Sequence, residues 1–140
     1  KYAKLEKIIS NYDIIINNLP VNRVTKEIFD INIFKRLKND SCIISCGRHG
    51  IFNLKSLYKF LYKNKDSFLY IDAPIFEQQI KSNELVKISK MKNVYLSPHI
   101  GGYFKTYWPK QYQIFSDNLK IFMKGQKLKN QVSFKKRNFL

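Results

Sequence analysis

The sequence predicts an α/β fold in which a parallel β-sheet is flanked by helices. Four short segments are apolar almost throughout, and segments with helical spacing separate them along the chain. Strands of this kind are typical of parallel sheets that helices cover on both faces. Polar side chains of functional types follow the strands, and in such sheets ligands bind beyond the carboxyl ends of the strands. We therefore expect a ligand site at one edge of the sheet.

The first element is the end of an amphipathic helix over residues 3–10, and residues 13–18 form the first apolar strand. Leu19-Pro20 ends this strand, because proline has no N–H to donate to a neighbouring strand. Residues 24–38 are predicted to form short helical pieces. Their buried side is expected to comprise Ile28, Phe29, Ile33, Phe34 and Leu37.

The middle of the chain contains a strand, a turn and a helix. Residues 42–46 form the second apolar strand, and the glycines of residues 47–50 indicate a turn. Asn53 is of the residue type that caps helix amino termini, so a helix is predicted to begin after it and to run to Leu61.

The second half of the chain contains two further strands and a long helix. Residues 68–72 form the third strand, which ends on a carboxylate, and residues 93–97 form the fourth. A helix is predicted over residues 104–124, and Gly125 ends it. Its apolar stripe comprises Tyr107, Ile114, Phe115, Leu119 and Phe122.

The composition predicts one folded domain in a reducing compartment. The chain has 140 residues, of which 44% are hydrophobic and 15% aromatic, enough for a packed core. No apolar run approaches the roughly 18–20 residues of a membrane-spanning helix, and no signal peptide follows the start. The first residue is not Met, so the natural amino terminus is expected to lie upstream. Cys42 and Cys46 would lie about 13 Å apart along one strand, too far for a disulfide, and no zinc-like spacing is present. A cytoplasmic location and no metal are therefore expected.

The net charge of +16 raises the possibility of nucleic-acid binding. The charge is nearly all lysine, since only Arg23, Arg36, Arg48 and Arg137 are arginines, and the lysines form no single block. Because phosphate and base recognition usually recruits arginine, nucleic acid is not the expected partner.

Three side chains at strand ends carry the predicted chemistry. A guanidinium at Arg48, in a turn after the second strand, suits a substrate carboxylate, although a solvated loop arginine is the plain alternative. His99, after the fourth strand, suits acid–base work near neutral pH, although a lone histidine is more often structural. Glu77, five residues after Asp72, could orient that imidazole or simply be solvated. Their ordered occurrence favours the functional interpretation.

Other candidates are weaker. His49 adjoins Arg48 but has no evident acidic partner, and Cys46 is better explained as a small residue near a ligand than as a nucleophile. The stretch Lys127–Arg137 is most simply a solvated tail.

Several groups of residues follow one another in a recognisable order. They are residues 13–20 (DIIINNLP) with Thr25, residues 43–53 (IISCGRHGIFN) with Leu57, Asp72 with Glu77, residues 97–102 (SPHIGG), and a closing helix and tail with Tyr107-Trp108, Asn118-Leu119 and residues 125–132 (GQKLKNQV). Together they resemble the motifs of the D-isomer-specific 2-hydroxyacid dehydrogenases, the group that contains phosphoglycerate dehydrogenase and glyoxylate/hydroxypyruvate reductase. The resemblance covers about residues 5–134, nearly the whole chain.

The resemblance implies an oxidoreductase that transfers hydride between NAD(P)H and a 2-oxo or 2-hydroxy acid. Arg48 would bind the substrate carboxylate and polarise the 2-oxo group. His99 would supply or remove the proton of the substrate oxygen, and Glu77 would hold His99. Asp72 would meet the nicotinamide carboxamide. The other implied cofactor contacts are Leu19, Pro20 and Thr25 on the adenosine side, and Cys46, Gly47, Arg48, His99, Gly101 and Gly102.

The chain departs from the family pattern at four positions without losing a catalytic group. Asn18 stands where many relatives have histidine or another polar residue, and His49 where glycine is frequent. Asn53 replaces a frequent aspartate, and Gln78 a frequent proline. These replacements bear on loop geometry.

The sequence contains no GxGxxG turn, which cradles the cofactor pyrophosphate in dinucleotide-binding folds. In the family this turn lies upstream of the position that corresponds to residue 1. We therefore expect residues 1–125 to be the second half of a Rossmann-like NAD-binding domain, and residues 126–140 to be a tail returning toward an absent substrate lobe. Alone, the chain is expected to bind NAD feebly and to turn over nothing. The residue that selects NAD over NADP would also lie upstream, and the resemblance implies a homodimer.

The alternative is a basic binding module that has kept the fold without the activity. Nucleic acid is a conceivable ligand of such a module. The joint presence of Arg48, Glu77 and His99 favours the enzyme, because a repurposed module has no reason to retain all three.

Overall fold

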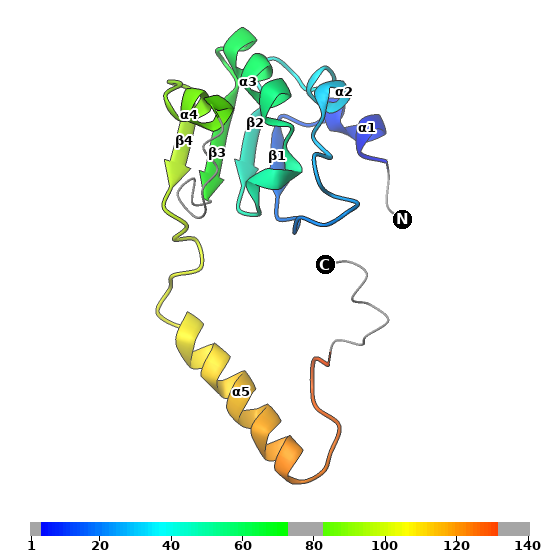
Figure 1. Ribbon diagram of the computed structural model, residues 1–140, viewed down its shortest axis with the longest axis vertical. Coiled ribbons are helices and arrows are strands. Elements are labelled where there is room, and N and C mark those ends of the chain that lie inside the picture. Colours follow the sequence, from blue (N-terminus) through cyan, green and yellow to red (C-terminus); the bar gives the residue numbers. More distant parts are fainter. Residues whose placement is uncertain (1–3, 73–82, 132–140) are drawn as a thin grey trace. The chain divides into compact units, whose positions relative to one another are not determined.

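The structure is a computed structural model that describes residues 4–72 and 83–131. The chain divides between His99 and Ile100 into two compact units. The first is an α/β unit with a sheet, and the second contains the long helix α5 (Tyr107–Met123) (Figure 1).

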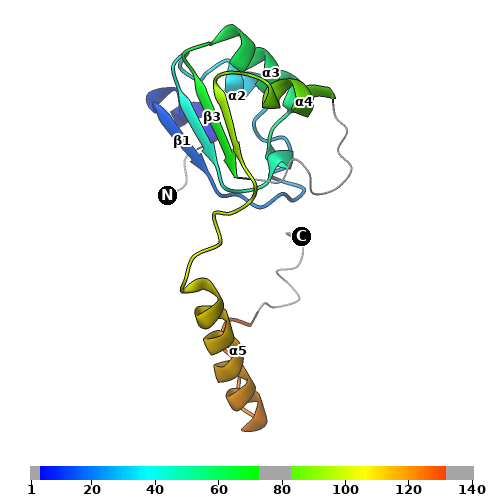
Figure 2. The ribbon, with the colours of Figure 1, turned by 90° about the vertical axis from the view of Figure 1, so that its left-hand side faces the viewer.

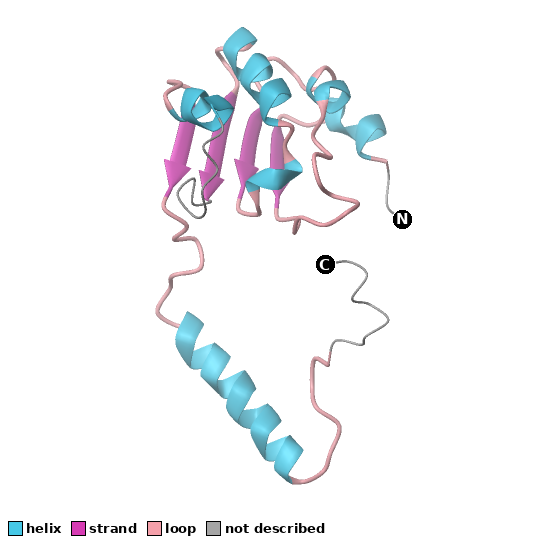
Figure 3. Ribbon diagram, viewed as in Figure 1, coloured by secondary structure: helices cyan, strands magenta, loops and turns pink. Residues whose placement is uncertain are grey.

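The first unit alternates strands and helices in the predicted order (Figure 3). Its elements are α1 (Leu5–Ile8), a 3₁₀ turn (Ile9–Asn11), β1 (Ile14–Asn17), α2 (Ile31–Phe34), β2 (Cys42–Ser45), a second 3₁₀ turn (His49–Ile51), α3 (Leu54–Lys63), β3 (Phe68–Asp72), α4 (Asn83–Ser89) and β4 (Val94–Ser97).

The four strands form one sheet in the order β1-β2-β3-β4, and every neighbouring pair is parallel. The register aligns Ile44 with Ile16 of β1 and with Tyr70 of β3, and Tyr70 in turn with Tyr95 of β4. The predicted parallel sheet is confirmed, and all four carboxyl ends lie at the same edge.

Side-chain caps determine where the helices begin. The Asn53 side chain accepts a hydrogen bond from the Ser56 backbone N–H at 3.0 Å, so α3 begins where the sequence predicted. Asp30 caps α2 in the same way, through the N–H groups of Asn32 and Ile33. The helical pieces predicted over residues 24–38 reduce to the single turn of α2, because much of the preceding segment is bonded as turns and a bridge at Phe29.

The hydrophobic core lies between one face of the sheet and the helices. Ile43, Leu69 and Ile71 point from the sheet into this layer and are at most 1% exposed. The helices that cover them lie on the same side (Figure 2). Their buried side chains are Ile33 and Phe34 of α2, Leu57, Phe60 and Leu61 of α3, and Leu85 and Ile88 of α4.

The opposite face of the sheet has no helix over it in the described part of the first unit. Ile14, Ile16 and Tyr95 project from this face and are 59%, 65% and 61% exposed. Within the described part of the first unit, the expected helical cover therefore lies on one face of the sheet. Apolar side chains on both sides of each strand indicate that both faces suit burial, but they do not supply the second layer. The uncharged side chains of this open face are Ile14, Ile16, Cys42, Ile44, Phe68, Tyr70, Tyr95 and Ser97.

The second unit contains α5, which ends as predicted at Gly125. Gly125 has a φ of +64° and donates to the Phe122 carbonyl at 2.9 Å, while the Gln126 N–H donates to the Ile121 carbonyl at 3.1 Å. This pair of bonds is the glycine-dependent helix end in which a left-handed residue satisfies the last carbonyls. No residue of α5 is buried. No helix in the described part of the chain is long and apolar enough to cross a membrane.

The one-sided core predicts unequal costs for two matched isoleucine substitutions. Ile43→Ala should lower the free energy of unfolding by about 2–5 kcal/mol, because it leaves a cavity in the core. Ile16→Ala should lower it by less than about 1 kcal/mol, because the side chain is exposed on the open face. Urea unfolding of the two variants measures both values. Equal losses would show that the open face is covered in solution.

Candidate active site

The candidate site lies at the edge where the four parallel strands end. The residues after β1 (18–21) and after β2 (46–48) meet there, together with Asp72 at the end of β3 and His99 just after β4. Parallel pairing therefore brings Arg48, Asp72 and His99 to one edge.

Arg48 and His99 lie side by side at this edge. Nη1 of Arg48 is 3.5 Å from Nε2 of His99, although 51 residues separate them in the sequence. Arg48 is exposed and precedes the 3₁₀ turn His49–Ile51, whereas His99 is partly buried. A cationic fork beside an imidazole can hold an anionic ligand next to a proton donor or acceptor.

His99 has a strained backbone. Its φ of +58° lies in the left-handed region, where a non-glycine residue costs roughly 1–3 kcal/mol. Such strain persists only where the surroundings impose it, and it concentrates at functional sites. It fixes the direction in which the imidazole leaves the end of β4.

A hollow of about 570 Å³ lies beside Arg48. Its lining comprises Asn18, Leu19, Pro20, Val21, Cys46, Gly47 and Arg48. Five of these residues (Leu19, Pro20, Cys46, Gly47 and Arg48) are predicted cofactor contacts, so the structure brings half of the predicted contact set together around one cavity. Cys46 is exposed, and its thiol forms no disulfide.

The loop after β1 is held by a residue that the sequence analysis did not single out. Asn17 is 3% exposed and donates from Nδ2 to Oγ of Ser45 at 2.9 Å. Its Oδ1 accepts a hydrogen bond from the Leu19 N–H at 3.1 Å. This asparagine ties the end of β1 to β2 and sets the course of the loop that carries Leu19. The sequence signal that could have identified Asn17 is a polar residue at the end of an apolar strand.

Thr25 closes the same loop at its other end. Its hydroxyl donates to the Pro20 carbonyl at 2.5 Å and accepts from the Asn22 N–H at 2.9 Å. The hydroxyl is thus engaged within the loop, and its effect on a ligand would come through the position of Pro20.

Gly47 is required by packing inside the protein. A Cβ at this position would lie 2.7 Å from the Leu19 carbonyl oxygen and 2.9 Å from Asn17 Nδ2. On the side where a Cβ would lie, the loop after β1 already fills the space. The predicted contact of Gly47 with a cofactor concerns the hollow that this residue also lines.

His49 is set apart from His99 by its surroundings. Burial lowers the pKa of His49 below its ordinary value, and the positive charge of Arg48 lowers it further. The imidazole of His49 is therefore disfavoured as a cation, and it remains the weaker candidate for acid–base chemistry.

Asp72 ends β3 almost fully buried, at 3% exposure. The hydroxyl of Ser97 donates to Oδ1 of Asp72, and the Tyr70 hydroxyl donates to Ser97 Oγ at 2.9 Å. The sequence analysis quoted Ser97 within a motif and gave Tyr70 no role. Strand register was the missing information, because it alone places Asp72 opposite Ser97.

Four residues of the predicted motifs have no place in this description of the edge. Glu77 and Gln78 lie outside the described residues. Gly101 and Gly102 belong to the second unit, where a Cβ at Gly102 would meet nothing within 4 Å.

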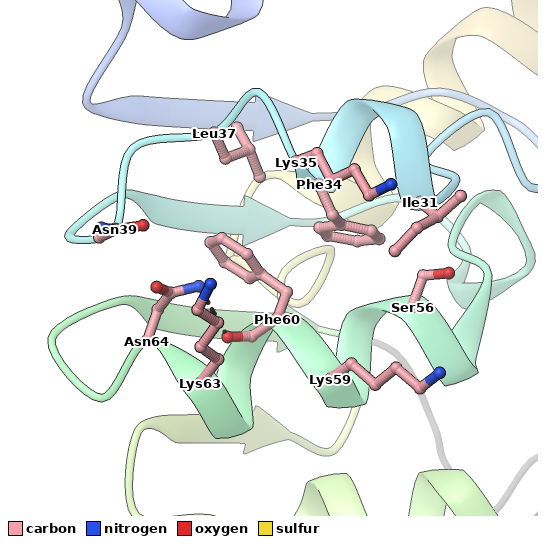
Figure 4. A pocket seen from close by; sticks show the side chains of 10 residues that line it. All are labelled: Ile31, Phe34, Lys35, Leu37, Asn39, Ser56, Lys59, Phe60, Lys63 and Asn64. Carbon is pink, nitrogen blue, oxygen red and sulfur yellow. Dashed lines mark hydrogen bonds between the residues drawn. The ribbon is translucent and has the colours of Figure 1, made fainter.

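A second hollow lies between α2 and α3 (Figure 4). Phe34 and Phe60 form its apolar floor, and Lys35, Lys59 and Lys63 stand around it. None of the predicted site residues lines it, so it gives no reason to place the chemistry there.

Known proteins resemble the chain in sequence and in structure. Residues 1–101 match the model of the D-isomer specific 2-hydroxyacid dehydrogenase, NAD binding domain. Glyoxylate reductase of Thermococcus litoralis is 26% identical over 126 residues, which are 90% of this chain and 37% of the reductase. The NAD⁺-bound D-lactate dehydrogenase of Lactobacillus jensenii superposes with a TM-score of 0.77 at 20% identity, covering 94% of this chain and 43% of that one.

A further structure is a D-isomer specific 2-hydroxyacid dehydrogenase of Xanthobacter autotrophicus in complex with NADPH, with a TM-score of 0.74 at 17% identity. It covers 96% of this chain and 53% of that protein. At this identity the structural likeness concerns the fold. The chain spans about a third of the length of the curated relatives that it matches.

The packing of Gly47 predicts that Gly47→Ala destabilises the first unit. The added methyl group must displace backbone of the neighbouring loop, which should cost about 1–3 kcal/mol of unfolding free energy. Gly102→Ala is the matched control, because its Cβ would meet open space. Chemical unfolding compares the two. A Gly47→Ala variant as stable as the wild type would contradict a packing role for this glycine.

Proposed function

The chain belongs to the D-isomer specific 2-hydroxyacid dehydrogenase family, and on that basis we propose that it carries the catalytic groups of an oxidoreductase for 2-oxo and 2-hydroxy acids. The observation that supports this most strongly is the 3.5 Å separation of Arg48 Nη1 and His99 Nε2. An anion-binding fork and an acid–base group are what reduction of a 2-oxo acid requires.

NAD is the cofactor of the family domain that the chain matches. The residues present fit such a group, because the hollow beside Arg48 combines an apolar wall at Leu19 and Pro20 with the guanidinium of Arg48. Leu19 and Pro20 would hold the adenosine side, and Asp72 would accept a hydrogen bond from the nicotinamide carboxamide. Reduced nicotinamide, when bound, supplies the hydride. These residues do not select between NAD and NADP.

Arg48 binds the substrate in this proposal. Its guanidinium accommodates both oxygens of a carboxylate with two parallel hydrogen bonds, which fixes the plane of the 2-oxo acid. Its exposure leaves the fork accessible from the edge of the sheet. The same positive charge polarises the adjacent carbonyl group.

His99 donates or accepts the proton of the substrate oxygen in this proposal. In reduction it donates a proton to the carbonyl oxygen as the carbonyl carbon gains hydride, and in oxidation it takes the proton from the hydroxyl group. Its proximity to Arg48 supports this role, because a carboxylate bound by Arg48 would lie next to the imidazole. Glu77 is proposed to orient His99, as the family motif implies.

The 140 residues on their own are proposed to be inactive. They contain no GxGxxG turn, so the cofactor pyrophosphate lacks its usual cradle. Weak binding through the nicotinamide and adenosine contacts is what remains.

Activity is expected once the missing cradle is supplied. The chain would be fused behind the part of Thermococcus litoralis glyoxylate reductase that precedes the matched region, and NADH oxidation would be followed with glyoxylate. His99→Ala and Arg48→Ala should each lower kcat/KM by roughly 100-fold or more. Arg48→Lys should not restore it, because an ammonium cannot form the two parallel bonds.

His49→Gln is the matched control, since it removes the other histidine of the chain and should leave activity near that of the parent fusion. A folded, active fusion in which His99→Ala is as active as His49→Gln would contradict the role of His99. Detectable hydride transfer by the 140 residues alone would contradict the need for the glycine-rich turn.

A further inference from the structure

We propose that Ser97 and Tyr70 are positioning residues that hold the Asp72 carboxylate as an acceptor for the nicotinamide carboxamide. This inference rests on the proposed function and adds two residues to it. It concerns a chain of hydrogen bonds that crosses from β3 to β4 at the carboxyl edge of the sheet.

The three side chains share one face of neighbouring strands. Tyr70 and Asp72 are two residues apart on β3, and Ser97 lies opposite Asp72 on β4. Residues two apart on a strand project from the same face. The Tyr70 hydroxyl donates to Ser97 Oγ at 2.9 Å, and the Ser97 hydroxyl donates to Oδ1 of Asp72.

The direction of these bonds determines which form of Asp72 fits. A hydroxyl group has one proton, so Tyr70 commits its proton to Ser97 and Ser97 commits its own to Asp72. A proton on the same oxygen of Asp72 would face the Ser97 proton. The chain is therefore complete only when Asp72 accepts at this oxygen, and successive hydrogen bonds strengthen one another in a buried setting.

A carboxylate held in this way suits an amide ligand. The two oxygens of a carboxylate offer about four acceptor positions, which is more than the bond from Ser97 uses. Asp72 ends β3 at the same edge as Arg48 and His99, where the nicotinamide ring must lie for the proposed reaction. The carboxamide is the group of the nicotinamide whose N–H₂ can donate a hydrogen bond to Asp72.

The Tyr70 ring is fixed by its neighbour. Tyr70 and Tyr95 stack with ring centroids 5.9 Å apart and planes inclined by 13°. Tyr70 is half-buried, whereas Tyr95 is 61% exposed. Stacking restricts the ring, so the Tyr70 hydroxyl stays directed at Ser97. The phenol of Tyr95 lies on the same face but is not a member of the hydrogen-bond series Tyr70–Ser97–Asp72.

The test measures binding of half-cofactors to the 140-residue chain by NMR titration. Reduced nicotinamide mononucleotide carries the carboxamide, and ADP-ribose lacks it. Ser97→Ala and Tyr70→Phe should weaken binding of the mononucleotide roughly two- to tenfold, as loss of one hydrogen bond to the carboxylate predicts, and leave ADP-ribose binding unchanged. Ser97→Thr, which keeps the hydroxyl, should retain binding. Tyr95→Phe is the matched control and should bind like the wild type.

Each other outcome counts against the inference. Equal mononucleotide binding by wild type and both variants would overturn it while leaving the proposed function intact. Parallel weakening of mononucleotide and ADP-ribose would show a structural role only. A wild-type chain that does not bind the mononucleotide at all would contradict the proposed cofactor site, and the inference with it. A global change of the amide spectrum in Ser97→Ala would mean that this variant is misfolded. The mononucleotide binding of Tyr70→Phe, which removes a single oxygen atom, then decides whether the inference holds.

Discussion

Parallel pairing of four consecutive strands is the constraint on which the candidate site depends. Because β1 to β4 all run the same way, each strand brings its carboxyl end to one edge, and each connection returns over a helix or loop. Arg48 and His99 are 51 residues apart in the chain and 3.5 Å apart in space for this reason. The core on one face of the sheet holds the strands in register. Two hydrogen bonds hold the loop after β1 in place: the Leu19 N–H donates to Asn17, and the Thr25 hydroxyl donates to the Pro20 carbonyl.

The sequence predicted the features that depend on local pattern and chain direction. Alternating apolar strands and helices predicted the parallel sheet, the residue type of Asn53 predicted the start of α3, and Gly125 predicted the end of α5. The edge that gathers Arg48 and His99 followed from the rule for parallel sheets. The resemblance to a family, which the matched domain confirms, supplied the roles that pattern alone could not assign.

The features that the sequence did not predict depend on pairing between distant residues. Apolar side chains on both sides of β1 predicted a second helical layer, but Ile14 and Ile16 remain exposed on the open face of the described unit. No local pattern reveals that a Cβ added at Gly47 would lie 2.7 Å from the Leu19 carbonyl oxygen. The bond between Ser97 and Asp72 required the register of β3 against β4.

The claim that Arg48 and His99 form one anion-binding, acid–base pair is tested most directly by NMR titration of the chain with oxamate, an unreactive 2-oxo acid analogue. The side-chain signals of Arg48 and His99 should shift together and saturate with one dissociation constant, and Arg48→Lys should weaken the binding. Shifts confined to lysine side chains elsewhere on the surface, with Arg48 and His99 unmoved, would contradict the claim.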